Sequence, residues 1–171
     1  MALTKTPICE FGKKAQDFQL KSTNNDLISL NDIAGENGTL IMFICNHCPY
    51  VKAVIKDIVK DCLKLESLGI KAVAINSNDV KKYPEDSFEN MIDFSNNNNF
   101  NFPYIFDETQ EIAKKYGAVC TPDFFGYNNK LELQYRGRVG ELREAMEQIA
   151  DSAKGPLKQT PSMGCNIKWF K

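Results

Sequence analysis

Two cysteines separated by two residues, Cys45 and Cys48, are the residues of this chain best suited to chemistry. An apolar run at residues 39–44 ends directly before them, and an amphipathic pattern begins directly after them. This order predicts a strand, then the dithiol, then a helix whose N-terminus carries both sulfurs. Unpaired backbone N–H groups and the helix dipole favour a thiolate there, and the thiolate is the nucleophile of disulfide exchange. The motif therefore indicates a thiol-based redox protein.

Within this motif we assign Cys45, at the end of the strand, as the exposed attacking thiolate. Cys48, one helical turn later, is assigned as the resolving thiol that breaks the mixed disulfide. His47 lies between them and, when cationic, would stabilise the thiolate. It is the single histidine of the chain, so no pair of histidines is available for catalysis. The alternative is that both sulfurs simply pack in the core.

A zinc site is the competing use of Cys45, His47 and Cys48. Structural zinc takes four ligands, and the chain has neither a second Cys-x-x-Cys nor a histidine pair. Cys120 or Cys165 would have to fold back to complete such a site. We therefore predict no metal and no other cofactor.

Composition sets the broad class of the protein. The chain has 171 residues, 43% of them hydrophobic and 25% charged, with a net charge of -1. These values are typical of one soluble domain, and they give no reason to expect nucleic acid or a membrane surface as a partner. The first residues contain no apolar segment of the secretory kind, which predicts a cytoplasmic location. In that reducing compartment, six cysteines are not expected to form a disulfide framework.

The pattern of apolar residues predicts an α/β fold that positions the dithiol. Buried strands are expected at residues 39–44 and 70–75, short strands near 102–106, 123–127 and 131–136, and helices at about 50–68, 84–94, 108–116 and 141–153. Residues 96–99 are expected to form a loop. We predict a single domain, 1–171, with a central mixed sheet between two layers of helices. An N-terminal extension (1–38) containing a hairpin precedes it, and a C-terminal tail (155–171) docks on its body.

Several patches of the sequence resemble the thioredoxin superfamily, in particular its peroxiredoxin-like (redoxin, AhpC-TSA-like) branch that carries a Cys-x-x-Cys. They are Gly12-x-x-Ala15-x-Asp17-Phe18-x-Leu20, residues 45–52, 76–79, 118–125 and 135–138, and Pro161-Ser162-Met163-Gly164-Cys165-Asn166-Ile167-Lys168-Trp169. Together they span nearly the full length. The resemblance implies a thioredoxin-like fold in which the bond between Thr121 and Pro122 is cis and lies beside the dithiol, supporting an extended substrate.

The chain departs from true peroxiredoxins at the catalytic motif Pro-x-x-x-Thr-x-x-Cys. With Cys48 in the last position, Cys45 replaces the threonine and Ile41 falls near the proline. The partner arginine would have to be Arg136 or Arg138. We therefore favour a thiol-disulfide oxidoreductase over a thiol peroxidase that uses Cys48 with Cys45 or Cys165 resolving. A non-catalytic binding module is the third alternative.

The expected partners are a disulfide-containing protein or a small-molecule disulfide, together with a thiol electron donor of unknown identity. Three further cysteines have distinct expected roles. Cys62 lies on the apolar face of its helix and is expected to be a core residue. Packing and an auxiliary redox role are equally open for Cys120. Cys165 is either a reduced thiol in a docked tail or a third redox thiol.

Overall fold

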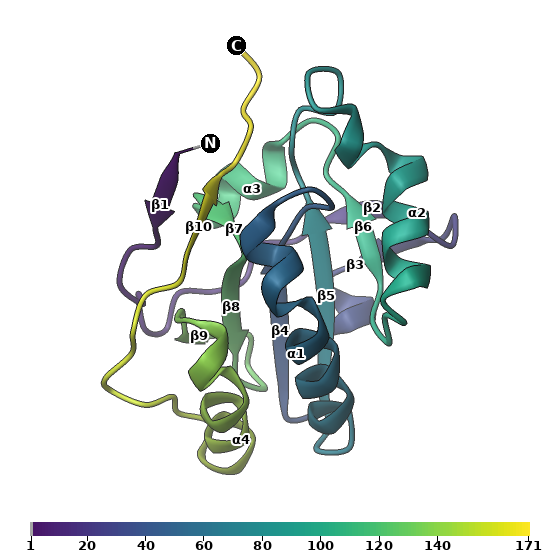
Figure 1. The fold of residues 1–171 in the computed structure, drawn as a ribbon. Helices are drawn as coiled ribbons and strands as arrows, with labels where there is room; N and C mark the ends of the chain where they lie inside the picture. Colours follow the sequence, from purple (N-terminus) through teal and green to yellow (C-terminus); the bar gives the residue numbers. More distant parts are fainter. Residues whose placement is uncertain (1) are drawn as a thin grey trace.

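A seven-stranded mixed sheet forms the centre of the molecule, in the order β3-β2-β6-β5-β4-β8-β9 (Figure 1). It is seen in a computed structural model that describes residues 2–171. The strands are β2 (Gln19–Ser22), β3 (Leu27–Ser29), β4 (Gly38–Phe43), β5 (Ile70–Asn76), β6 (Tyr104–Phe106), β8 (Asp123–Tyr127) and β9 (Leu133–Tyr135). β4, β5 and β6 run parallel, and the other pairs are antiparallel. The predicted N-terminal hairpin is the β2–β3 pair.

Helices cover both faces of this sheet, as predicted. On one face lie α1 (Pro49–Glu66), α2 (Phe88–Asn97) and α4 (Leu142–Ser152), whose buried residues share one core with Leu40 and Met42 of β4. On the other face, α3 (Glu111–Tyr116) and the short helix η1 (Asn31–Ile33) pack on Ile41 and Phe43. Every residue of β4 is buried, which explains its uninterrupted apolar sequence. The dithiol therefore follows a central strand that cannot shift without disturbing both cores.

A second, three-stranded sheet joins the two ends of the chain, in the order β1-β10-β7. Its strands are β1 (Leu3–Lys5), β7 (Cys120–Thr121) and β10 (Met163–Asn166), and the yellow C-terminal strand lies between the other two in Figure 1. The sequence did not predict these strands, because each is two to four residues long and shows no alternation of apolar and polar residues. Their pairing depends on contacts between distant parts of the chain.

Two predicted boundaries were wrong. α2 continues through Asn97, although residues 96–99 were expected to form a loop. α3 begins at Glu111 rather than near 108, because Gln110 has a left-handed backbone (φ 68°) and the Asp107 carboxylate accepts the N–H groups of Ile112 and Ala113. Within residues 2–171, no helix is both long and apolar enough to cross a membrane.

Candidate active site

The dithiol lies where β4 ends and α1 begins. Cys45 follows the strand after Ile44, whose N–H donates to the carbonyl of Ile75 on β5. Cys48 is the N-cap residue of α1, and Pro49 occupies its first turn, where a missing N–H costs nothing. The Cys48 carbonyl accepts the N–H of Lys52 at 2.9 Å, the first bond of the helix. This is the arrangement predicted from the order of strand, motif and helix.

Most of the polar groups around the Cys48 sulfur stabilise a thiolate, whereas the carbonyl oxygen of Thr121 accepts a hydrogen bond only from the protonated thiol. Its Sγ lies 2.9 Å from Sγ of Cys165 and 3.4 Å from the carbonyl oxygen of Thr121. The pKa of Cys48 is lowered to about 4, chiefly by a hydrogen bond from Cys45, with further contributions from Cys165, the side chain of Thr121 and the N–H of Val51. These interactions outweigh burial, which favours the neutral thiol.

Cys45 is as deeply buried as Cys48, but its pKa shifts in the opposite direction. Its Sγ lies 3.5 Å from Oγ1 of Thr121, and the residue is only 1% exposed. The pKa of Cys45 is raised well above the ordinary value by its hydrogen bond to Cys48, by burial and by the charge of Asp86. The prediction of an exposed Cys45 is therefore wrong, because β10 and the loop after β5 close over this end of the sheet. The structure favours the thiolate at Cys48 instead.

Asp86, in the short helix η2 (Pro84–Asp86), holds the backbone of the motif in place. Its fully buried Oδ1 accepts the N–H groups of Asn46 (2.8 Å) and His47 (3.1 Å), and Oδ2 accepts Nδ2 of Asn78 (2.9 Å). Oδ1 of Asn46 in turn accepts a hydrogen bond from the Tyr104 hydroxyl at 2.7 Å. Sequence reasoning missed Asp86, because an acid beside Pro84 indicates only the start of a helix.

His47 lies between Asp86 and an aromatic ring. Its Nδ1 pairs with Oδ2 of Asp86, and its ring stacks on Tyr83 with 5.7 Å between centroids. One donor atom each of Cys45, His47 and Asp86 lie within 4.8 Å of one another. This set includes Asp86 in place of the Cys48 considered from the sequence, and it offers one ligand fewer than a closed structural zinc site uses.

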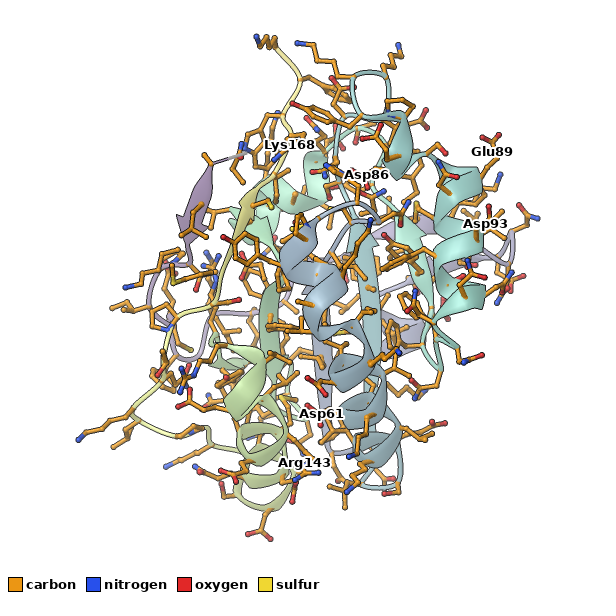
Figure 2. The ribbon with its side chains drawn as sticks, in the orientation of Figure 1. Asp61, Asp86, Glu89, Asp93, Arg143 and Lys168 are labelled. Atoms are coloured by element: carbon orange, nitrogen blue, oxygen red, sulfur yellow. The ribbon has the colours of Figure 1, made fainter. Side chains whose placement is uncertain are left out.

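The C-terminal tail is anchored at the same end of the molecule. Lys168 donates its N–H to Oδ1 of Asn78 (2.9 Å), and its carbonyl accepts the N–H of Asp79 (2.8 Å) and Nε2 of Gln110 (2.8 Å). Figure 2 shows Lys168 and Asp86 at this end, above the start of α1. The polar loop at residues 76–79 therefore connects the tail to the carboxylate that holds the motif.

Thr121 and Pro122 lie beside both sulfurs, and the bond between them is cis, as the resemblance implies. Thr121 contacts Cys45 through its hydroxyl and Cys48 through its carbonyl. Cys120 is fully buried and contacts the carbonyl of Pro122 at 3.6 Å. Burial raises the pKa of Cys120, which favours an unreactive thiol. Cys62 is 2% exposed, so its predicted place in the core is confirmed.

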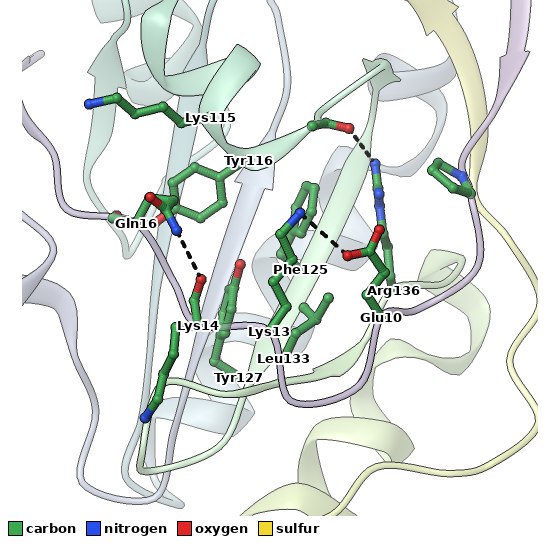
Figure 3. Close-up of a pocket in the computed structure, with 12 residues that line it drawn as sticks. Glu10, Lys13, Lys14, Gln16, Lys115, Tyr116, Phe125, Tyr127, Leu133 and Arg136 are labelled. Carbon is green, nitrogen blue, oxygen red and sulfur yellow. Dashed lines mark hydrogen bonds and ion pairs between the residues drawn. The ribbon is translucent and has the colours of Figure 1, made fainter.

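Each of the two candidate arginines is paired with a carboxylate. Arg136 donates to both carboxylate oxygens of Asp123 (2.8 and 3.2 Å) and to the carbonyl of Gly117, and it lies over the ring of Phe125. Figure 3 shows it at a pocket lined by the N-terminal segment. Arg138 is largely exposed and pairs with Glu141. Arg136 is therefore held by Asp123, whereas Arg138 lines the pocket that adjoins the motif.

An apolar pocket of about 340 Å³ adjoins the motif. Pro49 and Tyr50 from α1 form one side, Pro122 and Phe124 from the β7–β8 segment form another, and Met163 of β10 completes it. Tyr50 and Met163 are each 45% exposed. The pocket offers a substrate apolar contact next to the dithiol.

We expect Asp86→Ala to destabilise the reduced protein by about 2–4 kcal/mol, because it leaves buried N–H groups of the motif without an acceptor. Asp86→Asn is the matched control, since it keeps an acceptor oxygen and removes only the charge. It should cost less stability and should lower the pKa of Cys45, which the carboxylate raises. Urea unfolding and thiol titration measure the two effects. Equal stability of the alanine variant and the wild type would contradict this role.

Comparisons with known proteins find one matching family and several similar solved structures. The model of the AhpC/TSA family matches residues 11–141. None of the curated proteins compared with the chain matches it. An uncharacterised conserved protein from Geobacillus kaustophilus is 38% identical, with a TM-score of 0.96 over 99% of this chain and 97% of that one.

Two further solved structures are similar. A hypothetical protein from Sinorhizobium meliloti 1021 is 33% identical, with a TM-score of 0.92 over 97% of each chain. The thioredoxin domain of a thiol-disulfide oxidoreductase from Bacteroides vulgatus is 14% identical, with a TM-score of 0.67 over 82% of this chain and 97% of that one. The last similarity shows the fold alone, and it confirms the predicted thioredoxin-like class.

Proposed function

This chain belongs to the AhpC/TSA family, and we propose that it is a thiol-disulfide oxidoreductase working through Cys45 and Cys48. The observation that carries the proposal is the pair of sulfurs at the start of α1, one with a strongly lowered pKa and one that keeps its proton. A nucleophilic thiolate beside a second thiol can break a disulfide in two successive exchange steps.

In the first step, the Cys48 thiolate attacks one sulfur of the substrate disulfide, and the other substrate sulfur leaves as a thiolate. In the second step, Cys45 attacks Sγ of Cys48, releases the remaining substrate thiol and closes the Cys45–Cys48 disulfide. The order of the two residues reverses the one assigned from the sequence. Asp86 supports this order, because its charge opposes a thiolate at Cys45 while the helix N-terminus favours one at Cys48.

A thiol peroxidase at Cys48 is the second candidate, favoured by the lowered pKa of that thiol. The surroundings supply less for this reaction. Cys45 stands where peroxidases have the threonine of their catalytic motif, and Arg136 is held by Asp123. We therefore rank disulfide exchange first.

Single serine variants test the proposal. Cys48→Ser should reduce turnover of a small aromatic disulfide, with dithiothreitol as the reductant, by roughly 10³-fold or more. Cys48→Ser should lose the first step, and Cys45→Ser should be unable to form the Cys45–Cys48 disulfide that ends the second step. Cys9→Ser, remote from the site, is the matched control and should retain wild-type turnover. Full activity of Cys48→Ser would overturn the proposal.

A further inference from the structure

Cys165 has no part in the two-step reaction. Its sulfur nevertheless lies against that of Cys48, the residue that takes part in both steps. Its Sγ lies 2.9 Å from Sγ of Cys48, and the residue is 2% exposed. A disulfide bond is about 2.05 Å long, so a shift of less than one ångström would bring the two sulfurs to bonding distance. Three thiols therefore meet at this point, with Cys48 in contact with both of the others.

The strand that carries Cys165 is built into the site. β10 pairs with β7 in a register that places Cys165 opposite Thr121 and Asn166 opposite Cys120. On its other edge, Cys165 faces Leu3 of β1. The Ser162 hydroxyl, one residue before the strand, donates to the Pro122 carbonyl at 2.9 Å. The backbone of Thr121, which would be free to pair with an extended polypeptide substrate, is thus already paired with the tail.

Gly164 shows how closely the tail approaches. A Cβ at this position would overlap the carbonyl oxygen of Thr121 and come within 3.1 Å of the Pro122 nitrogen. Glycine is therefore required for β10 to lie at this distance from β7. The position of the Cys165 sulfur depends on this contact, because Cys165 is the next residue along the strand.

We propose that Cys165 is a third redox thiol, which replaces Cys45 as the disulfide partner of Cys48. The new disulfide holds the C-terminal strand β10 covalently in its position beside β7. The inference rests on the proposed function, since disulfide exchange at Cys48 supplies the oxidised pair. The sulfur of Cys165 attacks Sγ of Cys48 in the Cys45–Cys48 disulfide. The Cys48–Cys165 bond forms, the Cys45–Cys48 bond breaks, and the departing Cys45 sulfur takes up the proton that Cys165 loses. One disulfide replaces another, so the step requires no oxidant or reductant.

This arrangement has a consequence for the class of substrate. While β10 is docked, a polypeptide cannot pair with Thr121, and Cys48 lies beneath the tail. The docked form therefore excludes a polypeptide from this edge, and the Cys48–Cys165 bond makes the closed state covalent. Cys45 is left as a free thiol.

Disulfide mapping by mass spectrometry tests the proposal after the reduced protein has reacted with oxidised glutathione. We expect a Cys48–Cys165 linkage in the wild type, with Cys45 open to alkylation, and only Cys45–Cys48 in Cys165→Ser. Cys45→Ser isolates the inference, because it removes the dithiol but should still form Cys48–Cys165 and release two molecules of glutathione. Amide hydrogen exchange at Ile167, which bonds to Val119 within the tail's pairing, should slow in the linked form.

Gly164→Ala in the Cys45→Ser background tests the position of the thiol without removing a sulfur. We expect linkage of Cys48 to Cys165 to slow by roughly 100-fold, as misplacement of reacting groups by about 1 Å does in enzymes. Gly140→Ala is the matched control, since a Cβ there has no neighbour closer than 4.0 Å.

Two results would overturn the inference, and they differ from failure of the proposed function. In the first, the wild type yields only Cys45–Cys48, with Cys165 fully alkylated. In the second, Cys45→Ser remains a mixed disulfide at Cys48 with glutathione. A wild type that stays fully reduced would instead overturn disulfide exchange itself, and this inference with it.

Discussion

The thiolate of Cys48 is expected to persist in the reduced protein down to about pH 4. The pKa of this thiol is lowered from 9.0 to about 4. At pH 5, a thiol of pKa 9 is ionised to about one part in 10⁴, whereas Cys48 is about 90% ionised. Nucleophilicity falls with pKa and cancels roughly 10² of this difference, so a net advantage of about 10² remains.

Thiolate absorbance at 240 nm, taken as the difference between wild type and Cys48→Ser, measures this pKa directly. The difference should be constant between pH 5 and 8 and should disappear as the pH falls below about 4. The alkylation rate of Cys48 should be equally flat over the same range. A thiol that titrates above pH 8 would contradict the site described above, because none of the contacts to Cys48 would then be stabilising its charge.

The same shift predicts how stability depends on pH. The pKa of Cys48 is lower in the folded than in the unfolded protein, so ionisation of this thiol stabilises the folded state increasingly as the pH rises. This contribution to stability is lost as the pH falls towards about 4. The raised pKa of Cys45 acts in the opposite sense, but only above the ordinary thiol range. Between pH 5 and 8, the stability difference between reduced wild type and reduced Cys48→Ser should therefore widen with pH. A constant difference would show that Cys48 is neutral.

Replacing Arg136 by methionine is expected to destabilise the protein by about 3–5 kcal/mol, because it leaves a buried carboxylate without its partner. Asp123 is fully buried and follows Pro122 directly, and two nitrogens of Arg136 bind its two oxygens. Loss of this pair should also disturb the loop that places Thr121 against both sulfurs.

Arg138→Met is the matched control for this variant. Arg138 lies two residues further along, and its partner Glu141 is also exposed, so the change should alter stability by less than about 0.5 kcal/mol. Urea unfolding compares the two variants. An Arg136→Met protein of normal stability that has lost peroxide turnover would contradict the structural role of Arg136 and favour a peroxidase.

Much of this fold could be predicted from the sequence. The strand before Cys45 and the helix after Cys48 have strong local signals, namely an apolar run and an amphipathic repeat ended near Gly69. The cis bond at Pro122 was implied by the family resemblance rather than by any local pattern.

The parts that could not be predicted depend on contacts between distant residues. Asp86 lies 40 and 39 residues from Asn46 and His47, which it holds, and Cys165 lies 117 residues from Cys48. β7 and β10 are too short for a periodic signal. The exposure of Cys45 was mispredicted for the same reason, since the tail and the loop after β5 that enclose it are remote in sequence.

A competition experiment tests the central claim of disulfide exchange most directly. The reduced wild type is mixed with equal concentrations of a small disulfide and hydrogen peroxide, and loss of each is followed with dithiothreitol as the electron donor. We predict that the disulfide is consumed through the protein and that peroxide loss stays at the rate of dithiothreitol alone. Rapid peroxide loss that survives Cys45→Ser, with the disulfide untouched, would contradict the claim.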